Sequence, residues 1–112
     1  MNCKIVFTDT AKSDTAKSDL RDIAVYLAEL SKDKNLAIRF VRELQEKTRI
    51  LEQFPESGAI PRDRVLKSSG YRFLVYKDYL LFYLYEKEAN TAYIMAIFNG
   101  KRDYMRVMKK FL

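Results

Sequence analysis

The chain has 112 residues, 48% hydrophobic and 13% aromatic, which fits one globular domain over residues 1–112 and excludes an intrinsically disordered protein. Its longest uncharged runs are only as long as a strand, which excludes a transmembrane helix, so we expect no contact with a membrane. A lone cysteine, Cys3, and the lack of histidine exclude an internal disulfide and argue against a zinc site. We therefore expect no metal, no cofactor and a cytoplasmic location.

The formal net charge of +6 is unevenly placed along the chain. Residues 1–61 hold ten Lys or Arg and ten Asp or Glu, whereas residues 62–112 hold eleven and five. A basic half of this kind is typical of proteins that bind nucleic acid or an acidic partner. It also occurs in basic domains whose charge serves only solubility, and charge alone does not separate the two.

Residues 4–7 predict a short first strand, which is followed by a tandem repeat of the sequence TAKSD. The two copies occupy residues 10–14 and 15–19. Five residues turn a helix by about 500°, so an insertion within a packed helix would rotate its apolar face away from the core. The extra copy should therefore lie outside the packed part. It either lengthens the loop before the first helix or adds a solvated turn at the start of that helix.

Apolar residues at helical spacing predict one helix over about 14–31 and a second over about 36–54, which ends at Pro55. The short polar turn between them makes the pair a helical hairpin. Residues 56–69 then form an irregular segment in which Val65 and Leu66 predict a brief strand.

Residues 70–76, 79–85 and 91–98 are rich in aromatic and β-branched side chains, which is typical of strands. The polar breaks between them are short, so these strands should pair as antiparallel neighbours. Residues 103–111 predict a short C-terminal helix that begins at Asp103.

The expected fold is α+β, with an N-terminal strand, an α-helical hairpin packed on an antiparallel sheet of about four strands, and a short C-terminal helix. The residues expected in its core are Leu27, Phe40, Leu44, Leu51, Leu81 and Ile94.

This order of elements resembles the RelE/ParE toxin superfamily of bacterial toxin–antitoxin systems. Residues 54–58 (FPESG), 68–72 (SSGYR) and 100–102 (GKR) resemble the end of the family's second helix, the start of its central strand and its second basic site. The resemblance covers the whole chain apart from one TAKSD copy. It implies the toxin of a type II system, partnered by a cognate acidic antitoxin and bound to operator DNA only through the antitoxin complex.

The superfamily contains two activities, so the fold alone does not fix the function. RelE-like members cut mRNA on the ribosome, and ParE-like members inhibit DNA gyrase without any cleavage chemistry. We expect a ribosome-dependent, metal-independent mRNA endoribonuclease whose partners are the ribosome and mRNA. The alternative is a ParE-like, non-catalytic inhibitor of DNA gyrase, and a third possibility is a chain that only forms the antitoxin complex.

The resemblance matches Arg72 and Arg102 to two arginines that ribonuclease members use on the scissile phosphate, so we expect these two side chains to lie close together. Without histidine, the candidates for proton transfer are Tyr104, Lys101, Asp103 and Glu86, and Tyr104 is the tyrosine nearest to the position where those members carry one. The predicted catalytic residues are therefore Arg72, Arg102 and Tyr104. The predicted RNA-binding residues are Arg62, Arg64, Lys67 and Lys101.

Some features depart from the ribonuclease pattern. Asp63 and Val65 stand where those members carry lysines, and Met108 stands in place of a tyrosine. These departures favour the gyrase alternative. Arg72 could also pair with a carboxylate across the sheet, and residues 101–102 could be an ordinary solvated end.

Overall fold

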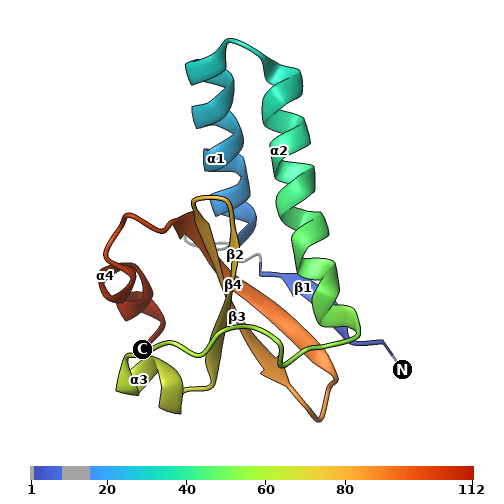
Figure 1. Ribbon diagram of the computed structural model, residues 1–112, viewed down its shortest axis with the longest axis vertical. Helices are drawn as coiled ribbons and strands as arrows, with labels where there is room; N and C mark the ends of the chain where they lie inside the picture. The colour runs from blue at the N-terminus through green and yellow to red at the C-terminus, as the bar shows by residue number, and fades with distance from the viewer. Residues whose placement is uncertain (1, 9–15) are drawn as a thin grey trace.

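The computed structural model describes residues 2–8 and 16–112 and consists of a four-stranded sheet with helices on both faces (Figure 1). The elements in chain order are β1 (Lys4–Phe7), α1 (Ala16–Ser31), α2 (Lys34–Lys47), the 3₁₀ helix η1 (Thr48–Glu52), α3 (Arg64–Ser68), β2 (Tyr71–Tyr76), β3 (Tyr79–Glu86), β4 (Thr91–Asn99), α4 (Tyr104–Met108) and the 3₁₀ helix η2 (Lys109–Phe111). Among the described helices, none has the length and hydropathy to cross a membrane.

The sheet has the strand order β1-β4-β3-β2. The predicted antiparallel pairing is confirmed for β2 with β3 and for β3 with β4. β1 instead runs parallel to β4, with Lys4 opposite Thr91 and Phe7 opposite Ile94, so the sheet is mixed rather than wholly antiparallel. The physical reason is the long connection from β1, which carries both long helices and can bring the chain back in the same direction.

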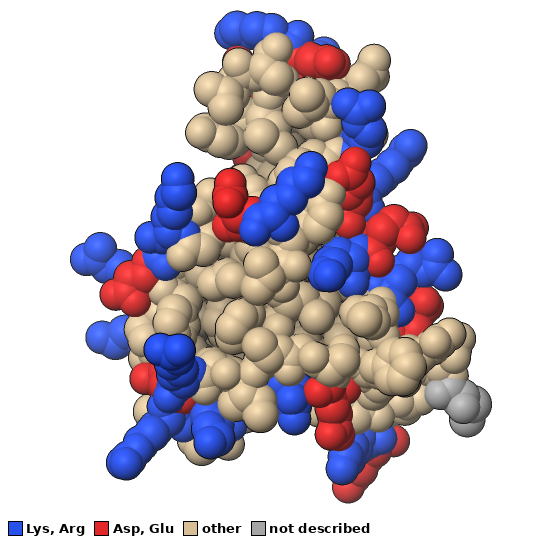
Figure 2. Space-filling view, in the orientation of Figure 1, with Lys and Arg blue, Asp and Glu red and all other residues tan. Residues whose placement is uncertain are grey.

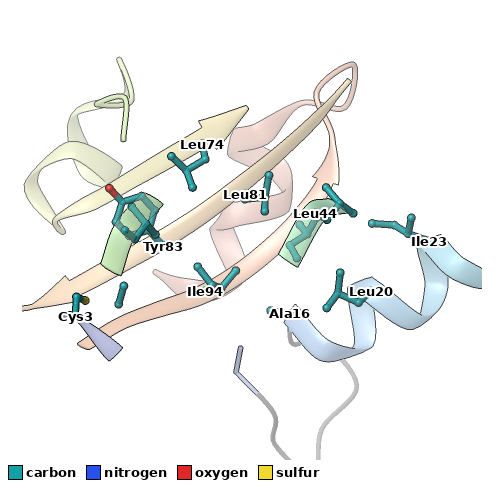
Figure 3. Close-up of a cluster of buried hydrophobic side chains, with 12 residues drawn as sticks. Cys3, Ala16, Leu20, Ile23, Leu44, Leu74, Leu81, Tyr83 and Ile94 are labelled. Carbon is teal, nitrogen blue, oxygen red and sulfur yellow. The ribbon is translucent and has the colours of Figure 1, made fainter. Parts of the chain in front are cut away.

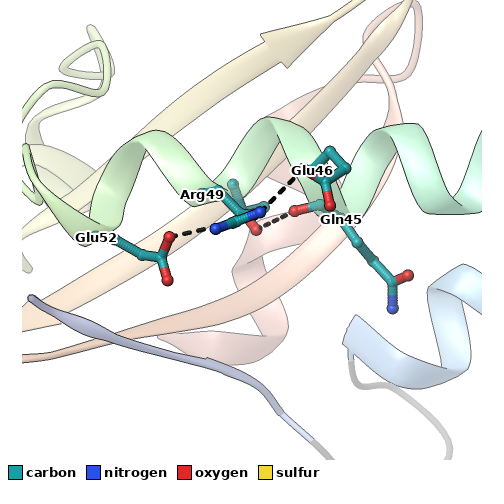
Figure 4. Close-up of polar contacts among 5 residues, drawn as sticks. Gln45, Glu46, Arg49 and Glu52 are labelled. Atoms are coloured by element: carbon teal, nitrogen blue, oxygen red, sulfur yellow. Dashed lines mark hydrogen bonds and ion pairs between the residues drawn. The ribbon is translucent and has the colours of Figure 1, made fainter.

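The helical hairpin is confirmed, and the break that its apolar pattern shows near residue 48 is a real change of helix type. Asp33 caps α2, because its carboxylate accepts hydrogen bonds from the N–H groups of Asn35 and Leu36 at 3.0 and 3.3 Å. At Thr48 the chain tightens into η1, and the buried Thr48 hydroxyl donates to the Gln45 carbonyl at 2.6 Å. The guanidinium of the neighbouring Arg49 bridges carboxylates on both sides of this junction (Figure 4).

The core between the hairpin and the sheet contains Leu44, Leu51, Leu81 and Ile94, all fully buried as predicted (Figure 3). The other two residues that we expect there, Leu27 and Phe40, are only partly buried and pack against the edge of this cluster. The reason is visible in the ribbon, where the far half of the hairpin projects beyond the sheet (Figure 1).

A second core lies on the opposite face of the sheet, under the short helices α3 and α4. Its buried members are Leu66, Tyr71, Phe82, Ala96, Phe98 and Met108. The helix predicted at the C-terminus is confirmed: Asp103 caps α4 by accepting a hydrogen bond from the Met105 N–H at 3.1 Å.

The brief strand predicted at Val65 and Leu66 is wrong, because these residues lie in α3. The carboxylate of Asp63 accepts hydrogen bonds from both of their N–H groups, at 2.9 and 3.0 Å, and so starts a helix. The β-type pairing in this segment lies earlier, where Ala59 forms an isolated bridge with Phe73.

The TAKSD copies differ in their position. The first copy lies outside the described residues. Residues 16–19 of the second copy form the first turn of α1, where Ala16 is fully buried and the carboxylate of Asp19 accepts a hydrogen bond from the Ile97 N–H at 2.8 Å. Ile97 lies beyond the end of the β1–β4 pairing, so Asp19 supplies the partner that a longer β1 would have given.

Candidate functional site

Arg72 is anchored to the protein's own backbone. It is half-buried on β2, and its Nη1 donates a hydrogen bond to the Gly58 carbonyl oxygen at 3.1 Å. Its cross-strand partner is Tyr83, whose hydroxyl oxygen accepts a hydrogen bond from the Gly58 N–H at 2.9 Å. Two side chains therefore hold both polar groups of Gly58, and this role explains Arg72 without a phosphate.

Residue 58 has to be glycine for this contact to form. A Cβ there would lie 2.5 Å from the Tyr83 hydroxyl oxygen and 2.6 Å from the Cε1 atom of the ring. Burial raises the pKa of the Tyr83 hydroxyl above its ordinary value of 10.0, although the Gly58 hydrogen bond and the Arg72 charge act in the opposite direction. Tyr83 therefore stays neutral at physiological pH and acts as a hydrogen-bonding partner rather than as a base.

Arg102 lies at the other end of the sheet. It is exposed, three residues beyond β4, and lines a cavity of about 380 Å³ together with Asp19, Asp22 and Tyr26 of α1. Asn99 pairs with Tyr79, four residues along β3 from the partner of Arg72, and four residues of a strand span about 13 Å. We expect Arg72 and Arg102 to lie close together, and the structure instead places them at opposite ends of the sheet.

Tyr104 lies on the opposite face of the sheet from Arg72. It is half-buried, with its ring stacked on Phe82 at 6.0 Å between centroids. Together with Arg62 it lines a cavity of about 340 Å³ whose walls include Phe73 and Leu80. Arg62 and Tyr104 share this cavity, and the three predicted catalytic residues occupy three separate places.

The remaining predicted RNA-binding residues are exposed, with Arg64 and Lys67 on α3 and Lys101 in the turn after β4. The structure adds three basic residues that the sequence reasoning missed, Arg106 on α4 and Lys109 and Lys110 on η2. Figure 2 shows Lys and Arg gathered at the lower left, over α3, α4 and the C-terminus, with few acidic groups among them. We call the following set the basic face: Arg62, Arg64, Lys67, Arg106, Lys109 and Lys110.

A groove that the sequence reasoning also missed runs between β1 and the helical hairpin. It has a volume of about 730 Å³. Its apolar lining comprises Ile5, Val6, Phe7, Leu20, Ala24, Ile38 and Val41, and Lys17, Arg21 and Arg42 add positive charge. The signal in the sequence is that the apolar stripes of both helices contain more residues than the core uses.

The groove is bordered by an open strand edge. β1 is at the end of the sheet, and the N–H groups of Lys4 and Thr8 donate to Asn90 and Ile94 on the β4 side. Strand alternation then turns the backbone groups of Ile5 and Phe7 outward, where an extended chain can pair with them.

Comparison with known proteins agrees with this architecture. The model of the family described as "ParE toxin of type II toxin-antitoxin system, parDE" matches residues 11–104. A solved structure, titled "Chromosomal ParDE TA system from P. aeruginosa", has a similar fold with a TM-score of 0.66 and 19% identity, over 87% of this chain and 95% of that chain. A search of curated proteins finds no significant match. The chain belongs to the ParE toxin family of type II toxin–antitoxin systems.

Proposed function

We propose that this toxin inhibits DNA gyrase by binding to it, without cutting RNA. The observation that carries the proposal is the family match over most of the chain, because ParE-like toxins are the gyrase-directed branch of the superfamily. From the sequence we expect an endoribonuclease, with a non-catalytic gyrase inhibitor as the alternative, and the family match favours the gyrase inhibitor.

The geometry of the predicted catalytic residues supports this choice. Cleavage of RNA by its own 2′-hydroxyl needs a base, an acid and cations around one phosphate. Here Arg72 is bound to Gly58, Arg102 lies beside the carboxylates of α1, and Tyr104 is on the other face of the sheet. No single phosphate could be reached by all three side chains without rearrangement of the fold.

The segment before β2, which contains Asp63 and α3, also argues against cleavage of RNA. Ribonuclease members carry lysines there, whereas Asp63 is used as the cap of α3 and Val65 is an exposed residue of that helix. A carboxylate at this position would repel a phosphate rather than stabilise it.

The test compares two reactions with the same purified protein. Supercoiling of relaxed plasmid by gyrase should be inhibited, and mRNA on programmed ribosomes should remain intact. Cuts at fixed codon positions together with unimpaired supercoiling would restore the endoribonuclease reading. Inhibition of neither reaction would leave only the antitoxin-binding role.

Membership of the family implies a cognate antitoxin, and we propose that one of its segments occupies the groove beside β1. The apolar lining fits the apolar side chains of such a segment, and Lys17, Arg21 and Arg42 fit the charge of an acidic one. The outward backbone groups of Ile5 and Phe7 can add an extended stretch to the sheet. From the charge of residues 62–112 alone, an acidic antitoxin would be expected to cover Arg72 or Arg102, and neither of these residues lines the groove.

A further inference from the structure

The basic face accounts for most of the protein's unbalanced charge. Its six Lys and Arg lie in residues 62–69 and 101–112, whose acidic residues are Asp63 and Asp103, so the face carries a net +4 of the chain's formal +6. The two segments are far apart in sequence, but Leu66 of α3 and Met108 of α4 belong to one buried cluster. The fold therefore gathers most of the net charge on one face of the sheet.

The two carboxylates of these segments are engaged as helix caps rather than in the ion pairs found among the described residues. The carboxylate of Asp63 accepts hydrogen bonds at the start of α3, and that of Asp103 does the same for α4. Within residues 2–8 and 16–112, ion pairs involve Arg49, Lys77 and Lys87 but not Arg62, Arg64, Lys67, Arg106 or Lys109. Exposed cations without carboxylate partners attract a polyanion from solution.

Among the described residues, the face carries no largely exposed aromatic ring of the kind that reads single-stranded nucleic acid. Single strands are held by stacking of bases on exposed aromatic rings. The described aromatic residues that are largely exposed are Tyr26 on α1 and Phe54 after η1, neither of which lies on this face. Near the basic face the rings of Tyr71, Phe82 and Phe98 are buried in the core, and the half-buried ring of Tyr104 is already stacked on Phe82. Charge without stacking platforms fits the regular phosphate array of a duplex.

We infer that the basic face binds the phosphate backbone of duplex DNA, independently of sequence. The choice of DNA over duplex RNA rests on the proposed function, because gyrase acts on duplex DNA. In the complex of toxin, gyrase and DNA, the basic face contacts the DNA bound to gyrase, while other surfaces of the toxin contact gyrase itself. In the sequence-based prediction Arg62, Arg64 and Lys67 bind RNA. Here the same three residues bind DNA, together with Arg106, Lys109 and Lys110 of the basic face.

The experiment measures the affinity of the full-length protein for a fluorescein-labelled duplex DNA of arbitrary sequence, as salt is raised. Each phosphate contact adds about −0.9 to the slope of log K against log salt concentration. The variant Arg64→Gln/Lys67→Gln should reduce the steepness of the slope by about 2, and Arg106→Gln/Lys109→Gln should do the same. The matched control is Lys32→Gln/Lys34→Gln, which removes the same charge from the exposed turn of the helical hairpin and should leave the slope unchanged.

Three outcomes would overturn the inference. The first is an equal loss for the hairpin-turn control, which would mean that only net charge matters. The second is tighter binding of a single-stranded oligonucleotide or of duplex RNA than of duplex DNA. The third is no DNA binding while the basic-face variants lose gyrase inhibition, which would make the face a protein contact. If the protein binds DNA as expected but leaves supercoiling untouched, the inference stands and the proposed function fails.

Discussion

Arg72 and Tyr83 lie opposite each other on β2 and β3 and hold the carbonyl and the N–H of a single residue, Gly58. This three-residue contact ties the loop after η1 to the sheet at the place where the sequence predicts a catalytic arginine. Mutations at Arg72 should therefore be tested first for an effect on stability, and only then for an effect on activity.

Removing the Tyr83 hydroxyl should destabilise the fold. Tyr83→Phe leaves the N–H of the buried Gly58 without a partner, which costs about 1–3 kcal/mol of unfolding free energy. Gly58→Ala should cost a similar amount, because the new methyl group overlaps the tyrosine ring. Urea denaturation measures both. Tyr93→Phe, on a half-buried tyrosine of β4, serves as the control and should be nearly neutral.

Arg72→Ala should affect stability and spare activity. The guanidinium donates a charge-assisted hydrogen bond to a carbonyl, and its loss should lower the unfolding free energy by about 1.5–3 kcal/mol. Below the melting temperature of the variant, gyrase inhibition per folded molecule should equal that of the parent. A fully folded Arg72→Ala protein that had lost all inhibition would instead return Arg72 to the functional site.

The position of Arg72 could have been worked out from the sequence with one further step. Side chains alternate along a strand, so Arg72 shares a face with Leu74 and Tyr76, the face that the helical hairpin covers. The two-residue break after Tyr76 likewise places Tyr79 opposite it and separates Arg72 from the end of β4. Composition predicts which segments are strands, but only register shows which residues meet.

Other features depend on contacts that no local pattern encodes. Val65 is a good strand former, and a single carboxylate at Asp63 outweighs that preference by starting a helix. The parallel pairing of β1 with β4 joins residues almost ninety positions apart, beyond the reach of hairpin rules. The helices other than α3, and the three strands after residue 70, were predictable because their apolar spacing and their short turns are local features of the sequence.

Deleting one TAKSD copy should leave the protein as stable or make it more stable. Thr8 already acts as a cap for α1 across the intervening residues, because its hydroxyl oxygen accepts from the Ala16 N–H and its carbonyl from the Lys17 N–H, both at 3.2 Å. Deletion of either copy yields the same chain, in which these donors become the third and fourth residues after Thr8. That spacing is the one a contiguous N-cap uses.

The expected gain is modest. Shortening the connection between Thr8 and Ala16 from seven residues to two lowers the entropy cost of closing it by about 1 kcal/mol. Thermal unfolding measures the effect, and Thr8→Val in the shortened chain should remove about 1 kcal/mol through loss of the cap. A large drop in the melting temperature of the shortened chain would show that the repeat itself is needed for packing.

Stability should fall in acid partly through Glu43, which joins α2 to the tip of the β2–β3 hairpin. Its carboxylate accepts a hydrogen bond from the Tyr76 hydroxyl and lies 3.7 Å from Lys77 Nζ. The hydrogen bond, followed by the nearby cations, holds the pKa of Glu43 below its ordinary value of 4.5, although partial burial opposes the shift. The folded protein therefore binds fewer protons at this site than the unfolded chain just below that pH. The stabilising contribution is complete above pH 4.5 and is lost as the pH falls towards the folded pKa.

Glu43→Gln should accordingly flatten the dependence of melting temperature on pH below 4.5, and Tyr76→Phe should do the same. Melting curves at neutral pH and at about pH 3 measure this. Glu46→Gln removes an exposed carboxylate on the same helix and should keep the parent's acid sensitivity. Equal flattening by Glu46→Gln would assign the effect to overall charge.

Antitoxin binding in the groove should be separable from inhibition of gyrase. Ile38→Glu places a carboxylate in an apolar groove proposed to hold an acidic segment, so it should weaken antitoxin binding by about 10- to 100-fold, or about 1.4–2.8 kcal/mol. Ile38 is 51% exposed, so the fold should tolerate the change, and the variant should still inhibit gyrase while antitoxin no longer rescues it. Ile50→Glu, at a similarly exposed isoleucine on η1 outside the groove, should bind antitoxin normally.

Charge at the groove should act on the rate of association. Arg21→Gln/Arg42→Gln should slow antitoxin association at low salt and make it less sensitive to added salt, because the two guanidinium groups steer an acidic chain towards the groove. Stopped-flow mixing of toxin and antitoxin at several salt concentrations measures this. If Arg64→Gln/Lys67→Gln slows association instead, the antitoxin covers the basic face, and the groove between β1 and the hairpin is not its docking site.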